Sequence, residues 1–214
     1  MSRKAIKTLA AIVIGLAATA AAGEGPAGRF FADAPDDFLL TVPRTARLDM
    51  LDYFRFGSSR PTPDEFGTDS RIIAESPACI TVEIGATRRQ LAVLPAGRDT
   101  LLAVVTTVAL PARASAIELF HKDFSAASQK PLAEVGRYSD WFVAGAFDSV
   151  PDLELTLPFV PAEASFDSTA TRLVLHNNAK QYLTAADYQR LHPLMLDSLT
   201  YDVAKGRFKR HKAK

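Results

Sequence analysis

The feature that most constrains this fold is a change of hydrophobic period, which becomes two in residues 71–121. Within 79–84, the apolar residues Ile80, Val82 and Ile84 take alternate positions and so fall on one face of an extended strand. The same pattern predicts further strands at 90–94, 100–110 and 116–121, with a turn at 95–99 and a break at Pro111. Short connections between such strands indicate an antiparallel meander.

The run 101–108 is almost wholly apolar, which is typical of a strand covered on both faces. We therefore expect it at the centre of the sheet. The other expected elements are helices at 34–42 and 46–56, a surface loop at 57–70, strands at 153–159 and 171–176, a helix at 185–191 capped by Thr184, and a hairpin of 199–203 with 207–209. The stretch 122–152 has no readable period, and 141–144 fits either a strand or a buried turn.

These elements predict an α+β fold, a mainly antiparallel sheet packed with two or three short helices. One core should join the second helix to the sheet. Its expected buried members are Leu48, Leu51, Phe54, Val104, Val108, Ile117 and Phe120.

Residues 1–22 are typical of a secretory signal peptide, because Arg3, Lys4 and Lys7 precede an apolar, alanine-rich run that ends in small residues. The run is too short and too weakly hydrophobic to favour a transmembrane helix, although an uncleaved anchor is the alternative. We expect a periplasmic or secreted protein, cleaved near Ala22, with no transmembrane span afterwards.

The expected organisation is a signal peptide at 1–22, a single domain at 23–204, and the end of the last hairpin with a basic tail at 205–214. Cleavage lowers the basic residues from 25 to 22 against 24 acidic ones, so the net charge of +1 becomes about −2. The tail holds six Lys or Arg, which leaves 16 basic against 24 acidic residues in 23–204. We expect a solvated tail and no nucleic-acid partner, because no face combines aromatic and basic residues.

The sequence offers no catalytic, cofactor-binding or metal residue, and we expect no cofactor. The four histidines lack zinc-site spacing, and a single cysteine excludes an intramolecular disulfide. Cys79 opens an apolar strand, where a buried and inert thiol is expected rather than a nucleophile. The letters G-x-G-x-x-G at 23–28 follow no strand and contain Pro26, so we interpret them as a flexible start of the mature chain.

Two local groupings have a functional interpretation and a structural one. His121 and Asp123 lie two apart, so a carboxylate could orient an imidazole for proton transfer, or both could be a solvated strand exit. Trp141 beside Asp140 and Tyr138 could line a sugar or peptide pocket, or could anchor the core.

Segments spread along the chain in a consistent order carry a resemblance. They are FFADAPDDFLL at 30–40, RLDMLDY at 47–53, LAVVTTVALP at 102–111, SAIELF at 115–120, PL at 131–132, QYLTAADY at 181–188 and GRF at 206–208. In these the sequence resembles an uncharacterised exported family from Bacteroidales, domain of unknown function 3256. The resemblance implies export and a mixed fold. It implies no activity, and no catalytic residue is transferred from it.

Three functions follow from these observations. The signal peptide, the sheet-rich pattern and the missing catalytic cluster favour an exported, non-enzymatic module that binds a protein, glycan or small molecule of the cell envelope. The first alternative is a structural part of an envelope assembly, in which an exposed sheet edge recruits a partner strand. The second is a hydrolase that uses separated carboxylates such as Asp123, Asp140 and Asp148.

Overall fold

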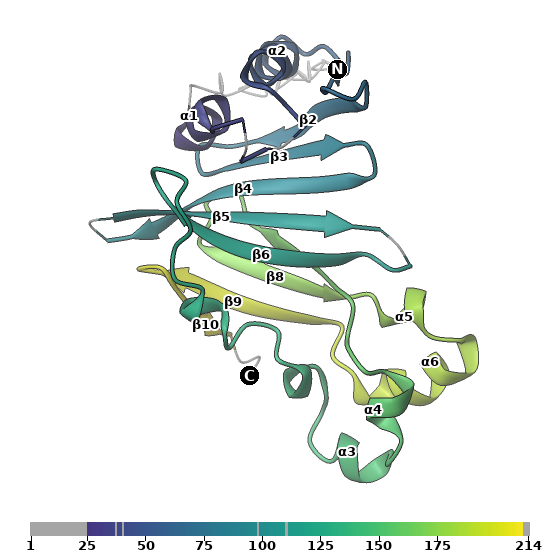
Figure 1. Cartoon of the computed structure of the whole chain (residues 1–214). Helices are drawn as coiled ribbons and strands as arrows, with labels where there is room; N and C mark the ends of the chain where they lie inside the picture. Colours follow the sequence, from purple (N-terminus) through teal and green to yellow (C-terminus); the bar gives the residue numbers. More distant parts are fainter. Residues whose placement is uncertain (1–24, 37, 40, 98, 110, 212–214) are drawn as a thin grey trace, which may run out of the picture.

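The structure is a computed structural model that describes residues 25–36, 38–39, 41–97, 99–109 and 111–211. These residues form two antiparallel sheets of six and four strands, with helices against the larger sheet and at one end of the molecule (Figure 1). The α+β class predicted from the sequence is confirmed. The expected signal peptide lies outside the described residues. No helix in the described part of the chain has the length and apolar character needed to cross a membrane.

The larger sheet has the order β1-β2-β3-β4-β5-β6, with bounds Thr62–Pro63, Asp69–Glu75, Cys79–Ile84, Thr87–Ala96, Asp99–Val108 and Ala114–His121. The smaller sheet has the order β10-β9-β8-β7, with bounds Arg207–Arg210, Ser198–Ala204, Arg172–Asn177 and Ala162–Phe166. The α-helices α1 to α6 are Pro26–Asp33, Arg44–Arg55, Ala146–Ser149, Leu153–Thr156, Ala179–Tyr182 and Ala185–Leu191. The 3-10 helices η1 to η3 are Lys130–Leu132, Tyr138–Trp141 and His192–Leu194.

The strands of the larger sheet send alternate side chains into two separate cores. In β5, Leu102 and Val104 join the core beneath α1 and α2, whereas Ala103 and Val105 join the core shared with the smaller sheet. All four are at most 6% exposed. The run 101–108 is therefore covered on both faces in its middle, as predicted, although β5 is the fifth strand of six rather than the central one.

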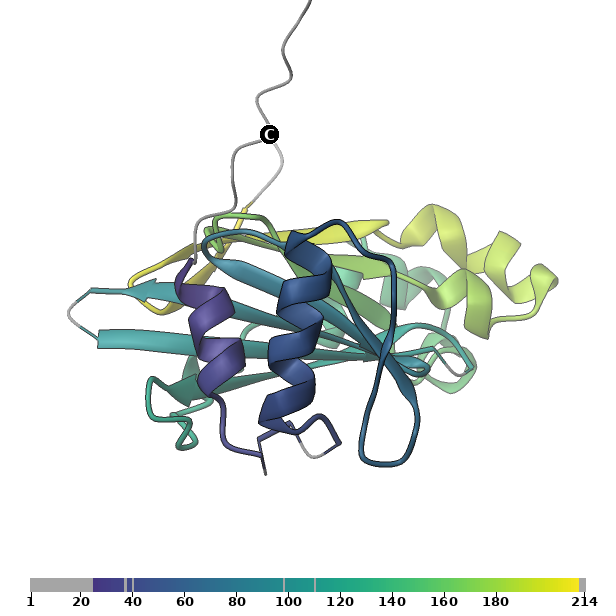
Figure 2. The ribbon, with the colours of Figure 1, turned by 90° about the horizontal axis from the view of Figure 1, so that it is seen from above.

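Helices α1 and α2 lie side by side over the larger sheet (Figure 2). The first helix comes earlier than predicted, at Pro26–Asp33, while most of 34–42 is turn and irregular chain. Pro26 occupies its first turn, so residues 26–28, which the sequence placed in a flexible start, belong to a helix. A Cβ on Gly28 would lie 2.5 Å from a carboxylate oxygen of Glu75, so glycine lets α1 approach β2 closely here.

Two members of the predicted core are exposed, and the prediction was wrong for them. Leu48 is 38% exposed because α2 buries the face that carries Ala46, Met50 and Leu51. Val108 is 47% exposed because it is the last residue of β5, beyond the cover of either core. Among the others, Leu51 and Val104 are buried, and Phe54, Ile117 and Phe120 are half-buried.

The strand predicted at 153–159 is instead the helix α4 followed by a turn. Leu153 and Leu157 are buried, four residues apart, whereas Leu155 between them is 88% exposed. A separation of four residues places Leu153 and Leu157 on the same face of a helix, whereas Leu155 points to the opposite side. The three leucines, which the sequence placed on one face of a strand, therefore do not share a face. The strand in this region is β7, which the sequence pattern did not reveal.

The hairpin of β9 and β10 forms as predicted, but the tail is not wholly solvated. Arg210 ends β10, and its Nη1 lies 2.8 Å from Oδ1 of Asp140, which is 11% exposed. The basic C-terminal segment therefore begins with a residue that is anchored to the body of the domain.

Candidate functional site

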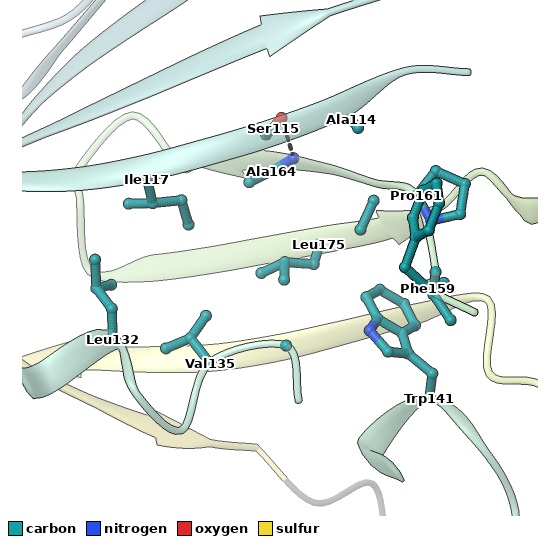
Figure 3. Close-up of a pocket in the computed structure, with 13 residues that line it drawn as sticks. Ala114, Ser115, Ile117, Leu132, Val135, Trp141, Phe159, Pro161, Ala164 and Leu175 are labelled. Atoms are coloured by element: carbon teal, nitrogen blue, oxygen red, sulfur yellow. Dashed lines mark hydrogen bonds between the residues drawn. The ribbon is translucent and has the colours of Figure 1, made fainter. Parts of the chain in front are cut away.

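A cavity of about 390 Å³ opens along the outer edge of β6 (Figure 3). The start of β6 forms one wall, and the segment 132–141 forms the opposite wall. Ala164 of β7 and Leu175 of β8 form the floor between them. Phe159 and Pro161 close one end beside Trp141. Residues that are distant in sequence thus meet in a hollow of the size that small-ligand sites have.

Main-chain contacts of Trp141 and Phe142 with residues 195–196 hold Trp141 in this wall. Its carbonyl accepts a hydrogen bond of 2.7 Å from the N–H of Leu196, and Phe142 forms a bridge with Met195. The indole ring is 1% exposed, so Trp141 is a core anchor and a cavity wall at once. Trp141 therefore anchors the core and also lines the cavity, whereas Asp140 and Tyr138 are not among the residues that line it.

The indole N–H of Trp141 is a donor without a partner among the described residues. Figure 3 shows the edge of the ring that carries the nitrogen facing Val135 and Leu175, on the cavity side. A buried indole N–H normally finds an acceptor. The cavity therefore presents this indole donor to whatever enters it.

The other side chains of the lining are apolar apart from Ser115, and within the described chain none of them is ionisable. Its hydroxyl, on Ser115, already accepts a hydrogen bond of 2.9 Å from the N–H of Ala164 and lies 2.8 Å from Oγ1 of Thr107. Tyr138 is turned away, because its hydroxyl donates to the carbonyl of Leu157 at 2.7 Å. Such a lining suits an apolar group, and its described side chains include no carboxylate, imidazole or thiol.

Cys79 is buried, as the sequence predicted. Its thiol donates to the carbonyl of Asp167 at 3.1 Å and so connects β3 to the smaller sheet. Burial raises the pKa of the Cys79 thiol to about 12, and the negative charge of Asp167 adds to the effect. A thiol with this pKa is a poor nucleophile at neutral pH.

His121 is the exposed last residue of β6, and Asp123 lies in the exposed turn that follows it. Asp123 accepts from both the N–H and the hydroxyl of Ser125, at 3.1 and 2.6 Å. The hydroxyl bond is the main reason that the pKa of Asp123 lies below its usual value. The carboxylate therefore shapes a turn, which is the structural interpretation of this pair.

The three carboxylates considered for hydrolysis lie in different settings. Asp123 is in the turn after β6, Asp148 is exposed in α3, and Asp140 is bound by Arg210. Within the described ranges no three His, Cys, Asp or Glu side chains gather closely enough to share a metal ion.

The sequence pattern did not reveal a cluster of charged residues between the sheets. Oε1 of Glu163 in β7 lies 3.0 Å from Nη1 of Arg88 in β4 and 3.2 Å from Nη1 of Arg113. Arg88 also borders a second hollow of about 290 Å³, lined in part by Glu83 and Thr107. The partners are separated by as many as 75 residues, so only the packing of β7 against the larger sheet brings them together.

Comparisons with known proteins give a family and a fold. No curated protein matches this sequence. The solved structure of a domain of an uncharacterized protein from Porphyromonas gingivalis W83 is similar, with a TM-score of 0.72 over 86% of this chain and 98% of that one. At 18% identity this likeness establishes the shared fold alone. The model of the family described as "Protein of unknown function (DUF3256)" matches residues 22–208, and the chain therefore belongs to that family.

Proposed function

We propose that this protein is an exported, non-enzymatic binding module that holds an apolar group of its ligand in the cavity beside β6. The observation that carries the proposal is a cavity of about 390 Å³ that is lined mainly by apolar side chains and faces the indole N–H of Trp141. Small-ligand sites are usually lined by apolar side chains and contain a few polar groups that orient the ligand.

The rim of the cavity supports the same proposal. Phe159 lines the cavity but is still 50% exposed, and its ring lies 5.1 Å from that of Tyr182 in α5. Exposed aromatic rings at the mouth of an apolar hollow favour contact with a ligand that extends beyond it.

Export is supported by residues 1–22, in which three basic residues precede an apolar run and small residues follow. The family match begins at residue 22, beside the expected cleavage site. The ligand would then be met outside the inner membrane, as part of a protein, a glycan or a small molecule of the envelope.

The size of the cavity sets the expected affinity for a simple apolar probe. A probe that buries about 250 Å² of apolar surface would gain roughly 6 kcal/mol at about 25 cal/mol per Å², which corresponds at best to a Kd of tens of micromolar. Probe concentrations up to the millimolar range are therefore appropriate.

Trp141 is the one tryptophan of the chain and lines the cavity, so its fluorescence reports occupancy directly. We expect bromine-substituted decanoate to quench Trp141 with saturation, because bromine quenches on contact. Ala164→Leu fills the floor of the cavity and should weaken quenching at least fivefold. Ala116→Leu, the same change at an exposed position of β6, should leave quenching unchanged. Linear, unsaturable quenching that is equal in all three proteins would refute the proposal.

A further inference from the structure

On β6, every second residue directs its main-chain N–H and carbonyl away from β5, toward the outer edge of the sheet. The N–H of Leu119 donates to Oε1 of Gln129 at 2.9 Å, and the carbonyl of Leu119 accepts from the N–H of Ala127 at 3.0 Å. The N–H of His121 donates outward as well, to the carbonyl of Ser125 at 2.9 Å. Because main-chain groups alternate in direction along an antiparallel strand, those of Ser115 and Ile117 also point away from β5.

The chain begins to add a seventh strand to this edge and then leaves it. Ala126 forms an antiparallel bridge with Phe120, and Gln129 completes the pairing with its side chain, which donates to the carbonyl of Leu119 at 2.9 Å. Pro131 in η1 then turns the chain away. The place where the added strand would continue is the cavity.

The other end of the β6 edge is covered too. The N–H of Arg113 lies 3.4 Å from Oε1 of Gln181, and its carbonyl accepts from Nδ2 of Asn178 at 2.9 Å. Between these covered ends, Ser115 and Ile117 line the cavity, and the described residues supply no partner for their N–H and carbonyl groups. Unpaired main-chain groups beside an apolar hollow are an incomplete β-sheet edge.

We propose that the ligand is a peptide segment of a partner protein, which adds to β6 as a short antiparallel strand at Ser115 and Ile117. This rests on the proposed function of the cavity. Two side chains at alternate positions of the peptide enter the cavity, and the indole N–H of Trp141 donates to a carbonyl of the same segment. The direction follows that of Ala126, which already pairs antiparallel to β6. Main-chain pairing gives such a complex its affinity, and the cavity selects apolar side chains.

A scan of N-methylated peptides tests the pairing without altering the protein. The probe is an acetylated, amidated heptapeptide in which leucine and threonine alternate, and binding is read from Trp141 fluorescence. Because only alternate amides of an added strand face β6, methylation should weaken binding at least tenfold at every second amide and less than twofold at the others. An equal effect at all amides, or none, would overturn the inference.

A protein variant gives the complementary test. Ile117→Pro removes an N–H that β5 does not use, so we expect the β5–β6 ladder to persist and peptide binding to fall at least tenfold. Ile117→Val keeps the N–H and should bind the peptide within twofold of the parent protein. If Ile117→Pro fails to fold, the methylation scan decides alone.

The probes separate this inference from the function on which it rests. Saturable quenching by bromine-substituted decanoate, with no binding of the heptapeptide at millimolar concentration, would overturn strand addition and leave the binding module standing. Absence of binding for both probes would overturn both.

Discussion

Arg210 binds Asp140 through two hydrogen bonds, one of 2.8 Å from Nη1 to the carboxylate and one of 2.9 Å from Nη2 to the main-chain carbonyl. Asp140 directly precedes Trp141, so the last strand of the chain positions a wall of the cavity. Arg137 lies near the same carboxylate, with Nε 3.5 Å from Oδ2. A C-terminal residue that the sequence placed in a solvated tail thus supports the candidate site.

We predict that Arg210→Gln lowers the free energy of unfolding by about 1 kcal/mol, because it removes a charge-assisted pair that is only partly exposed. The emission of Trp141 should shift to longer wavelength as its wall loosens. Lys209→Gln changes an exposed neighbour in β10 and serves as the control in urea denaturation. Equal midpoints and equal spectra for the two variants would contradict the role assigned to Arg210.

We predict a larger effect for Arg47, which is fully buried in α2. Its guanidinium donates to the carbonyls of Ala34 and Val42 and so fixes the connection between α1 and α2. Arg47→Met leaves both carbonyls unpaired and should cost about 2–4 kcal/mol, measured by denaturant unfolding. Arg44→Met, at an exposed site of the same helix, should cost less than about 0.5 kcal/mol. Similar losses for both variants would show that the buried bonds contribute little.

The Cys79 thiol should resist modification in the folded protein. With a pKa raised to about 12, fewer than about one thiol in ten thousand is ionised near neutral pH. Iodoacetamide should therefore label native Cys79 at least 100-fold more slowly than the unfolded chain, as followed by mass spectrometry. Rapid labelling of the native state would restore Cys79 as a candidate nucleophile.

The stability contributed by Asp167 should depend on pH. Burial alone would raise the pKa of Asp167, but the N–H of Arg172 and the donors of Thr169 and Thr171 outweigh it and lower the pKa below 3.8. A carboxyl with a lowered pKa stabilises the fold above its unfolded value, and that stabilisation is lost as the pH falls through the folded value. Asp167→Asn should therefore lower Tm at pH 6, and the difference from the parent protein should shrink below about pH 4.

The control for that titration is Asp49→Asn, at an exposed position of α2. It should change Tm little at either pH. A difference between Asp167→Asn and the parent protein that stays constant from pH 6 to pH 3 would contradict the assignment.

Export predicts a mature chain that begins near Gly23. Intact mass spectrometry of the protein recovered from the periplasm or medium should show the loss of residues 1–22. A membrane-bound product with the mass of all 214 residues would contradict the prediction.

The sequence correctly predicted those features of the fold that depend only on neighbouring residues in the chain. Ile80 and Val82 face one core and Cys79 faces the other, as their alternation indicated. Thr184 caps α6 and accepts from the N–H of Asp187, as the capping pattern indicated. The alternation of apolar residues in a strand and the N-cap of a helix each depend on a few consecutive residues, so both can be predicted from the sequence alone.

The elements that were missed depend on tertiary contacts. Leu153 and Leu157 have the spacing of one helix face. With the exposed Leu155 between them, the three leucines show the alternation that is typical of a strand. The cavity itself requires Ile117, Trp141 and Leu175 to meet, which strand order and loop paths decide rather than any local spacing. The burial of Cys79 could be predicted, whereas the pairing of Arg210 with Asp140 could not.

The two cores of the larger sheet have a consequence for divergence within the family. Their buried side chains belong to one core or the other, and the main chain of the sheet lies between them. Substitutions beneath α1 and α2 can therefore accumulate without reshaping the cavity, while on the proposed function changes in 114–117, 132–141 and 159–164 should alter ligand preference. If the cavity binds a ligand as proposed, relatives that share residues 25–56 can still differ in ligand, because that helical layer lies on the other face of the larger sheet.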